Sequence, residues 1–114
     1  MILIVGGRGA GKREYAKRAL GCSDEEISEG VLDENPVLAG LQDIVAKDPK
    51  GSAALLPLLI QKKAVICDEV GSGIIPMTQE GRETREAVGR LCIMLAGEAE
   101  SVVRIVCGIP QKIK

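Results

Sequence analysis

The chain of 114 residues has no histidine, phenylalanine or tryptophan, and it has a single tyrosine, Tyr15. Without such aromatic rings it cannot bind nucleic acids by base stacking. Its formal net charge is -1 and its basic residues are spread along the chain, so binding to DNA or to an anionic membrane is not expected either. Because aromatic residues are almost absent, the hydrophobic fraction of 46% must build an aliphatic core. The length of 114 residues predicts one domain, residues 1–114.

The chain also lacks any pair of cysteines at C-x-x-C spacing. Its cysteines, Cys22, Cys67, Cys92 and Cys107, are far apart, and Cys67 and Cys107 lie in apolar runs. We expect small buried hydrophobic residues in a reducing cytosol rather than disulfides or zinc ligands. No apolar run approaches the roughly 18 residues that cross a bilayer, and Met1 leads directly into an apolar segment, so we expect a soluble, cytoplasmic protein.

A glycine-rich segment at residues 6–13 follows the apolar run of residues 2–5. In the pattern G-x-x-x-x-G-K-[ST], backbone N–H groups surround nucleotide phosphates and the lysine reaches their oxygens. Gly6, Gly11 and Lys12 occupy the defining positions, and a helix expected up to Leu20 points its positive end at the loop. We predict that GTP or ATP binds to Gly6, Gly7, Arg8, Gly9, Ala10, Gly11, Lys12 and Arg13.

Arg13 departs from this pattern, because the eighth position is normally Ser or Thr. That hydroxyl is a ligand of the nucleotide's magnesium ion, and a guanidinium cannot bind a cation. The alternative interpretation is that the segment is one of the glycine-rich turns that connect a strand to a helix in many α/β proteins.

Hydrophobic periodicity predicts strands that alternate with helices. The short, wholly apolar runs are typical of parallel strands that are covered on both faces. We expect strands at residues 2–5, 64–67 and 101–107, an edge strand or extended loop at 27–32, and helices after the loop up to 20 and at 36–47, 53–60 and 78–99. This order predicts an α/β, P-loop NTPase-like three-layer fold with a small, mostly parallel sheet flanked by helices.

Asp68 and Glu69 follow the second strong strand directly. Ligands in open α/β sheets gather at the carboxyl ends of strands, so both carboxylates are expected at the same edge as the loop after Val5. There they would hold the magnesium ion that Arg13 cannot. The alternative is that one of them caps a turn or pairs with Arg82 or Arg85.

Residues 68–76 read D-E-V-G-S-G-I-I-P, Arg85 and Gly89-Arg90 follow, and residues 108–114 read G-I-P-Q-K-I-K. Together with the strand and loop of residues 1–20, these segments closely resemble the bifunctional adenosylcobinamide kinase/adenosylcobinamide-phosphate guanylyltransferase family of cobalamin biosynthesis. That family has N-E-V-G-x-G-I-V-P, R-D-x-x-G-x-x-N-Q and a G-x-x-x-x-L/I-K ending, after a G-G-x-R-S-G-K-S loop. The resemblance implies nucleotide binding, a cobinamide-type corrinoid as partner and a homo-oligomer.

The chain departs from the family in its centre, where family members are considerably longer. That region of the family carries the histidine that accepts GMP from GTP, and this chain has no histidine. The guanylyl-enzyme intermediate therefore cannot form as it does in the family, and we expect guanylyl transfer to be lost. Cys92-Ile93 also replaces the family's N-Q pair.

Three hypotheses about function remain open. In the first, the chain is a kinase-like enzyme in which Lys12 and Glu69 are catalytic and Asp68 and Glu69 hold magnesium. In the second, it is a noncatalytic, regulatory nucleotide-binding module in which Arg13 contacts a phosphate in place of the metal. In the third, it is a structural subunit of an oligomer, because a small domain with exposed sheet edges gains from a partner.

Overall fold

The computed structural model describes residues 1–69 and 78–114 of the chain. Residues 70–77, which hold the expected loop and most of the family-like segment, lie outside the described residues. The elements in chain order are β1 (Ile2–Gly6), α1 (Lys12–Leu20), η1 (Asp24–Glu26), β2 (Ile27–Glu29), β3 (Val37–Ala39), α2 (Leu41–Lys47), η2 (Ser52–Leu55), α3 (Leu56–Leu59), β4 (Ala64–Asp68), α4 (Gln79–Glu98), β5 (Ser101–Val106) and β6 (Ile109–Lys112).

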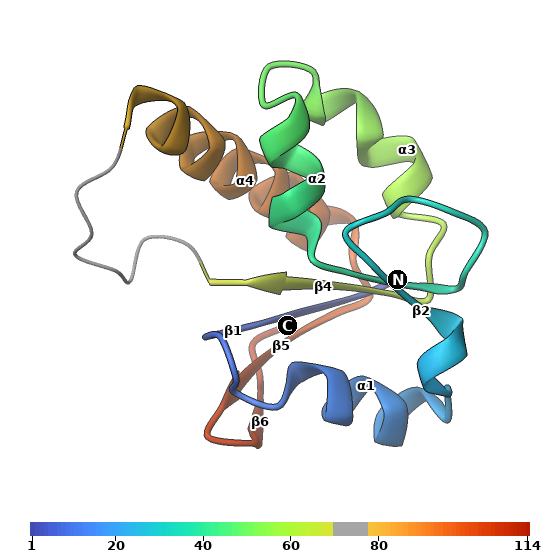
Figure 1. The fold of residues 1–114 in the computed structure, drawn as a ribbon. Helices are drawn as coiled ribbons and strands as arrows, with labels where there is room; N and C mark the ends of the chain where they lie inside the picture. The colour runs from blue at the N-terminus through green and yellow to red at the C-terminus, as the bar shows by residue number, and fades with distance from the viewer. Residues whose placement is uncertain (70–77) are drawn as a thin grey trace.

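The strands of the described residues form one sheet in the order β2-β3-β4-β1-β5-β6. The pairs from β2 to β5 are parallel, and β6 pairs antiparallel with β5. Helix α1 covers one face, and α2, α3 and α4 cover the other (Figure 1). The predicted α/β fold with a mostly parallel sheet in three layers is confirmed.

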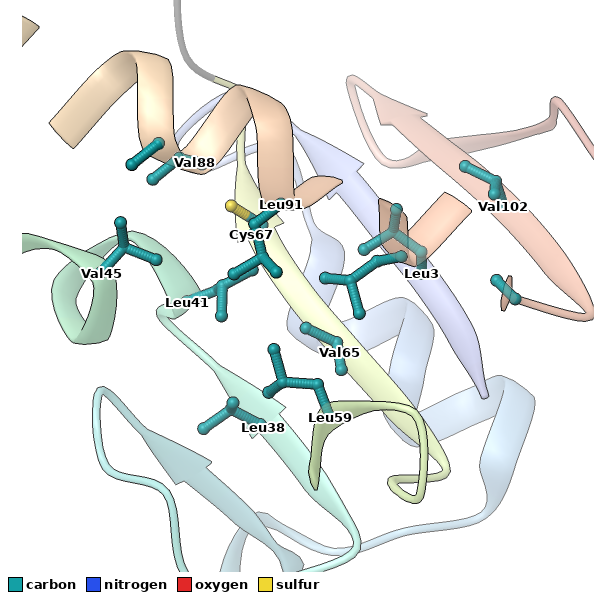
Figure 2. Close-up of a cluster of buried hydrophobic side chains, with 13 residues drawn as sticks. Leu3, Leu38, Leu41, Val45, Leu59, Val65, Cys67, Val88, Leu91 and Val102 are labelled. Atoms are coloured by element: carbon teal, nitrogen blue, oxygen red, sulfur yellow. The ribbon is translucent and has the colours of Figure 1, made fainter. Parts of the chain in front are cut away.

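Side chains of successive residues in the central strands enter different cores. Leu3 of β1 packs with α2, α3 and α4 in the larger cluster, whereas Ile4 packs with Ala16 of α1 on the opposite face. Figure 2 shows Leu3 and Val65 of the sheet within the larger cluster. Burial on both faces explains why these strands read as continuous apolar runs.

The helix boundaries agree with the local signals of the sequence. Helix α1 ends at Gly21, whose φ of 66° suits glycine. Helix α4 begins after Thr78, whose hydroxyl accepts a hydrogen bond from the Gly81 N–H at 3.0 Å. Within residues 1–69 and 78–114, no helix is both long enough and apolar enough to cross a membrane.

Residues 37–39 form strand β3, and the expectation that they begin a helix is wrong. Val37 pairs with Ala64 and Leu38 pairs with Val65 of β4. Because β3 is buried on both faces, it shows no apolar–polar alternation, and its apolar residues join those of α2 into one helix-like pattern. Gly40, with φ 71°, separates the strand from α2.

Strand β6 was not predicted, and it places Cys107 in a hairpin turn rather than in a buried strand. Cys107 has φ 50° and is exposed, so its assignment as a buried hydrophobic residue is wrong. Cys67 is buried, and a hydrogen bond with Cys92, together with burial, raises the pKa of the Cys67 thiol. All four cysteines are free.

Candidate functional site

The glycine-rich loop joins the carboxyl end of β1 to α1. The N–H of Ala10 donates to the Gly7 carbonyl at 3.1 Å, which closes a tight turn. Gly9 (φ 75°) and Gly11 (φ 98°) adopt left-handed backbone conformations that glycine tolerates best. Gly11 is the N-cap of α1 and no side chain caps this end of the helix. The first N–H groups of α1 therefore face the loop without a side-chain acceptor.

Strand β5 and the turn that follows it pack against the glycine-rich segment. A Cβ at Gly6 would lie 2.6 Å from the Ile105 carbonyl oxygen, so β5 leaves no room for a side chain there. The Gly108 N–H donates to the Ala10 carbonyl at 2.8 Å, and a Cβ at Gly11 would lie 3.3 Å from the Gly108 Cα. The turn between β5 and β6 thus braces the loop, a contact that sequence reasoning missed.

Lys12 and Asp68 meet at this edge of the sheet. Gly6 and Asp68 are register partners in the parallel β1–β4 pair, as expected from two strands that end together. The Lys12 ammonium lies 2.8 Å from Asp68 Oδ1 and donates to the Gly7 carbonyl at 2.8 Å. Its side chain is only 8% exposed, whereas that of Asp68 is 32% exposed. The lysine is therefore folded under the loop.

Gln42 of α2 completes the contacts of Asp68. Its Nε2 donates to Asp68 Oδ2 at 3.2 Å, and its Oε1 accepts from the Asp68 N–H at 3.3 Å. Sequence reasoning did not identify Gln42, because no local pattern marks a pair separated by 26 residues.

Glu69 turns to a different partner. Its carboxylate accepts two hydrogen bonds from Arg104 of β5, at 2.5 and 3.2 Å, and its N–H donates to the Gly6 carbonyl. The hydrogen bond with Glu69 raises the pKa of the Arg104 guanidinium. An ion pair at the strand end was among the expected alternatives, but Arg104 was not a suggested partner.

Arg13 points towards acidic side chains beyond α1. Its Nε lies 3.2 Å from Asp24 Oδ1 and its Nη1 lies 3.3 Å from Glu29 Oε2. Lys17 also contacts Asp24, and the hydrogen bonds from Lys17 and then Arg13 lower the pKa of that carboxyl. The Arg13 charge is thus matched by carboxylates of η1 and β2.

A pocket of about 190 Å³ lies beside Lys12, Arg13 and Asp68. It is lined by Gly9, Gly11, Lys12, Arg13, Glu14, Glu29, Ala39, Gly40, Ile66 and Asp68. In the part of the chain that the structure describes, no group of three or more His, Cys, Asp and Glu side chains is placed to hold a metal ion.

One comparison with known protein families matches more than half of the chain, towards its C-terminal end. The family described as cobinamide kinase / cobinamide phosphate guanyltransferase matches residues 45–113. This stretch includes β4, α4, β5 and β6 but not the glycine-rich loop. No curated protein matches the chain.

Proposed function

The chain belongs to the cobinamide kinase / cobinamide phosphate guanyltransferase family, and we propose that it binds the phosphates of GTP or ATP at residues 6–13. The observation that carries this proposal is the Lys12–Asp68 pair at 2.8 Å beside the uncapped N-terminus of α1. It combines a cation, the N–H groups of a helix N-terminus that no side chain caps, and a carboxylate, which together suit a magnesium-bound polyphosphate.

The loop has space for phosphate oxygens. A Cβ added at Gly7 or Gly9 would meet no atom within 4 Å, so the surface above both residues is open. Phosphate oxygens there can accept from the N–H groups at the start of α1, and Lys12 can exchange the Gly7 carbonyl for a phosphate. In this proposal, Arg13 contributes its backbone N–H while its guanidinium stays with Asp24 and Glu29.

Asp68 is the residue that we propose as the contact for magnesium. Its carboxylate oxygens suit Mg²⁺, which proteins commonly bind through one or two carboxylates together with substrate phosphates. When bound, the ion would neutralise charge on the phosphates. Glu69, the other candidate for metal binding and catalysis, is held by Arg104, and we assign it the role of fixing the strand end next to Gly6.

We propose nucleotide binding without transfer of GMP, because a phosphoramidate with a histidine cannot form in a chain that has none. Phosphorylation of a cobinamide-type alcohol in the cytoplasm remains compatible with the site, with Lys12 neutralising the charge on the transferred group. A homo-oligomer is the proposed assembly, and sedimentation at several concentrations tests it, a strict monomer being the contrary result.

A second candidate function is a noncatalytic nucleotide-binding module. It is favoured by Arg13, which stands where the hydroxyl ligand of magnesium is expected. Its signature would be nucleotide binding that EDTA leaves unchanged, with no turnover.

Titration calorimetry with GTP and ATP, each with Mg²⁺ and with EDTA, tests the proposal. We expect binding by the wild type and loss of at least about tenfold in affinity for Lys12→Ala, because a charge-assisted contact to phosphate is removed. Lys17→Ala is the matched control, since Lys17 lies on the same helix but pairs with Asp24. Absence of binding by the wild type at millimolar nucleotide would refute the proposal.

A further inference from the structure

Gln42 and Asp68 are joined by a reciprocal pair of hydrogen bonds between α2 and β4. The Asp68 N–H can only donate, so the amide oxygen of Gln42 must face it. The amide nitrogen is thereby left to donate to Asp68 Oδ2. Together the two bonds fix both the position of Gln42 and the rotation of the carboxylate.

This rotation determines what the other carboxylate oxygen faces. With Oδ2 bonded to Gln42, Oδ1 lies 2.8 Å from the Lys12 ammonium. Asp68 is about one-third exposed, and without the amide only the ion pair with Lys12 would restrain the rotation of its carboxylate. Gln42 therefore keeps one oxygen of Asp68 directed at the phosphate loop.

Gln42 is itself held on a rigid element. Its neighbour Leu41 and, one turn on, Val45 are fully buried in the core against the sheet. Helix α2 begins directly after β3 at Gly40, where a Cβ would lie 3.0 Å from the Gly30 N. The close fit of this turn leaves the first residues of α2 little freedom to move relative to the strand ends.

Resting on the proposed function, we propose that Gln42 is a positioning residue that holds Asp68 for the magnesium ion of the bound nucleotide. The two hydrogen bonds orient the carboxylate before the ligand arrives, so less conformational entropy is lost on binding. Gln42 need not touch nucleotide or metal for this role. Its effect passes through Asp68 alone.

The test compares Gln42→Met with Gln61→Met. Methionine matches glutamine in length but donates and accepts no comparable hydrogen bond, and Gln61 is an exposed glutamine near the amino end of β4. The readout is the ratio of the Kd for GTP in EDTA to the Kd in Mg²⁺. We expect Gln42→Met to lower this ratio about tenfold, the order found when a partner of a metal ligand is removed, with the EDTA value unchanged. Gln61→Met should match the wild type.

A second readout needs no nucleotide. If Gln42 orients Asp68 onto Lys12, its loss will expose the Lys12 amine to an acylating reagent, and mass spectrometry should show faster labelling of Lys12 relative to Lys17. Unchanged labelling of Lys12 would overturn the positioning role, as would an unchanged magnesium ratio.

The outcomes separate this inference from the proposed function. If Mg²⁺ strengthens GTP binding to the same degree in the wild type and in Gln42→Met, only the role of Gln42 is overturned. Wild-type binding without any magnesium effect overturns that role as well, since Asp68 would then serve no metal. Absence of wild-type binding overturns the proposed function. An equal rise of the Kd with and without Mg²⁺ in Gln42→Met indicates a general structural defect and also counts against the inference.

Discussion

Lys12 and Arg13 are adjacent cations, and the fold holds them in opposite ways. The Lys12 ammonium is buried beneath the loop between Asp68 and the Gly7 carbonyl. The Arg13 guanidinium is 37% exposed and faces two carboxylates that are each 60% exposed. A buried charge depends on its partners because water cannot replace them, whereas exposed pairs are screened and contribute little. The proposed site therefore depends on Lys12 and the strand ends, whereas Arg13 ties α1 to η1 and β2 through exposed ion pairs.

The largest expected effect on stability comes from the close contact between Gly6 and β5, next to Lys12. Gly6→Ala would place a Cβ 2.6 Å from the Ile105 carbonyl oxygen, so β1 and β5 must separate. We expect a loss of about 3 kcal/mol in the free energy of unfolding, measured by urea denaturation. Gly7→Ala is the control, because a Cβ there meets nothing within 4 Å and should change stability by less than about 0.5 kcal/mol. Equal losses in both variants would contradict the close packing at Gly6.

Asp68→Asn tests whether the buried cation depends on its partner. The Lys12 ammonium would lose its counter-charge, and we expect a loss of about 1.5 kcal/mol in the free energy of unfolding. Asp24→Asn, which weakens the exposed pairs of Arg13 and Lys17, should cost much less. Equal losses in the free energy of unfolding for the two substitutions would contradict the claim that Lys12 depends on its partner more than Arg13 does.

Arg13→Ser would sharpen the comparison by restoring the hydroxyl of the phosphate-loop pattern. The change removes only exposed ion pairs, so the free energy of unfolding should shift by less than about 1 kcal/mol. The new ligand should raise the ratio of the GTP Kd in EDTA to that in Mg²⁺ by about tenfold. Arg13→Ala serves as the control without a hydroxyl, and a similar gain there would show that removal of the arginine itself is responsible.

The smallest effect concerns pH and salt on the Arg13 side. Hydrogen bonds from Lys17 and Arg13 lower the pKa of Asp24 from its usual 3.8, so the folded state favours the ionised carboxylate. The stability that Asp24 contributes is present above pH 3.8 and is lost as the pH falls through the lower folded-state pKa. Urea midpoints of wild type and Asp24→Asn should therefore converge on acidification and in about 1 M NaCl. A difference that grows in acid would contradict this assignment.

Much of the fold follows from short-range patterns in the sequence. Apolar runs mark β1 and β4, Gly21 ends α1, and Thr78 caps α4. Strand β3 was missed because burial on both faces removes the alternation by which a strand is recognised. For the site, parallel strands that end together predicted that Asp68 lies beside the loop.

The partners of the site residues could not be predicted in this way. Gln42 reaches Asp68 across 26 residues and Arg104 reaches Glu69 across 35, so both contacts depend on how the sheet assembles. One of the three hypotheses placed Arg13 on a phosphate. The acids that contact it come from η1 and β2, where no sequence pattern pointed to a partner.

The brace between Gly108 and Ala10 has a consequence for the order in which the site forms. Residues 6–13 are translated well before Gly108, yet the Gly108 N–H donates to the Ala10 carbonyl of the loop. The loop residues must therefore wait for the β5–β6 hairpin before they reach their final shape. If the proposed nucleotide site is correct, docking of that hairpin is then a condition for tight binding, and a nascent or locally unfolded chain would bind GTP or ATP more weakly.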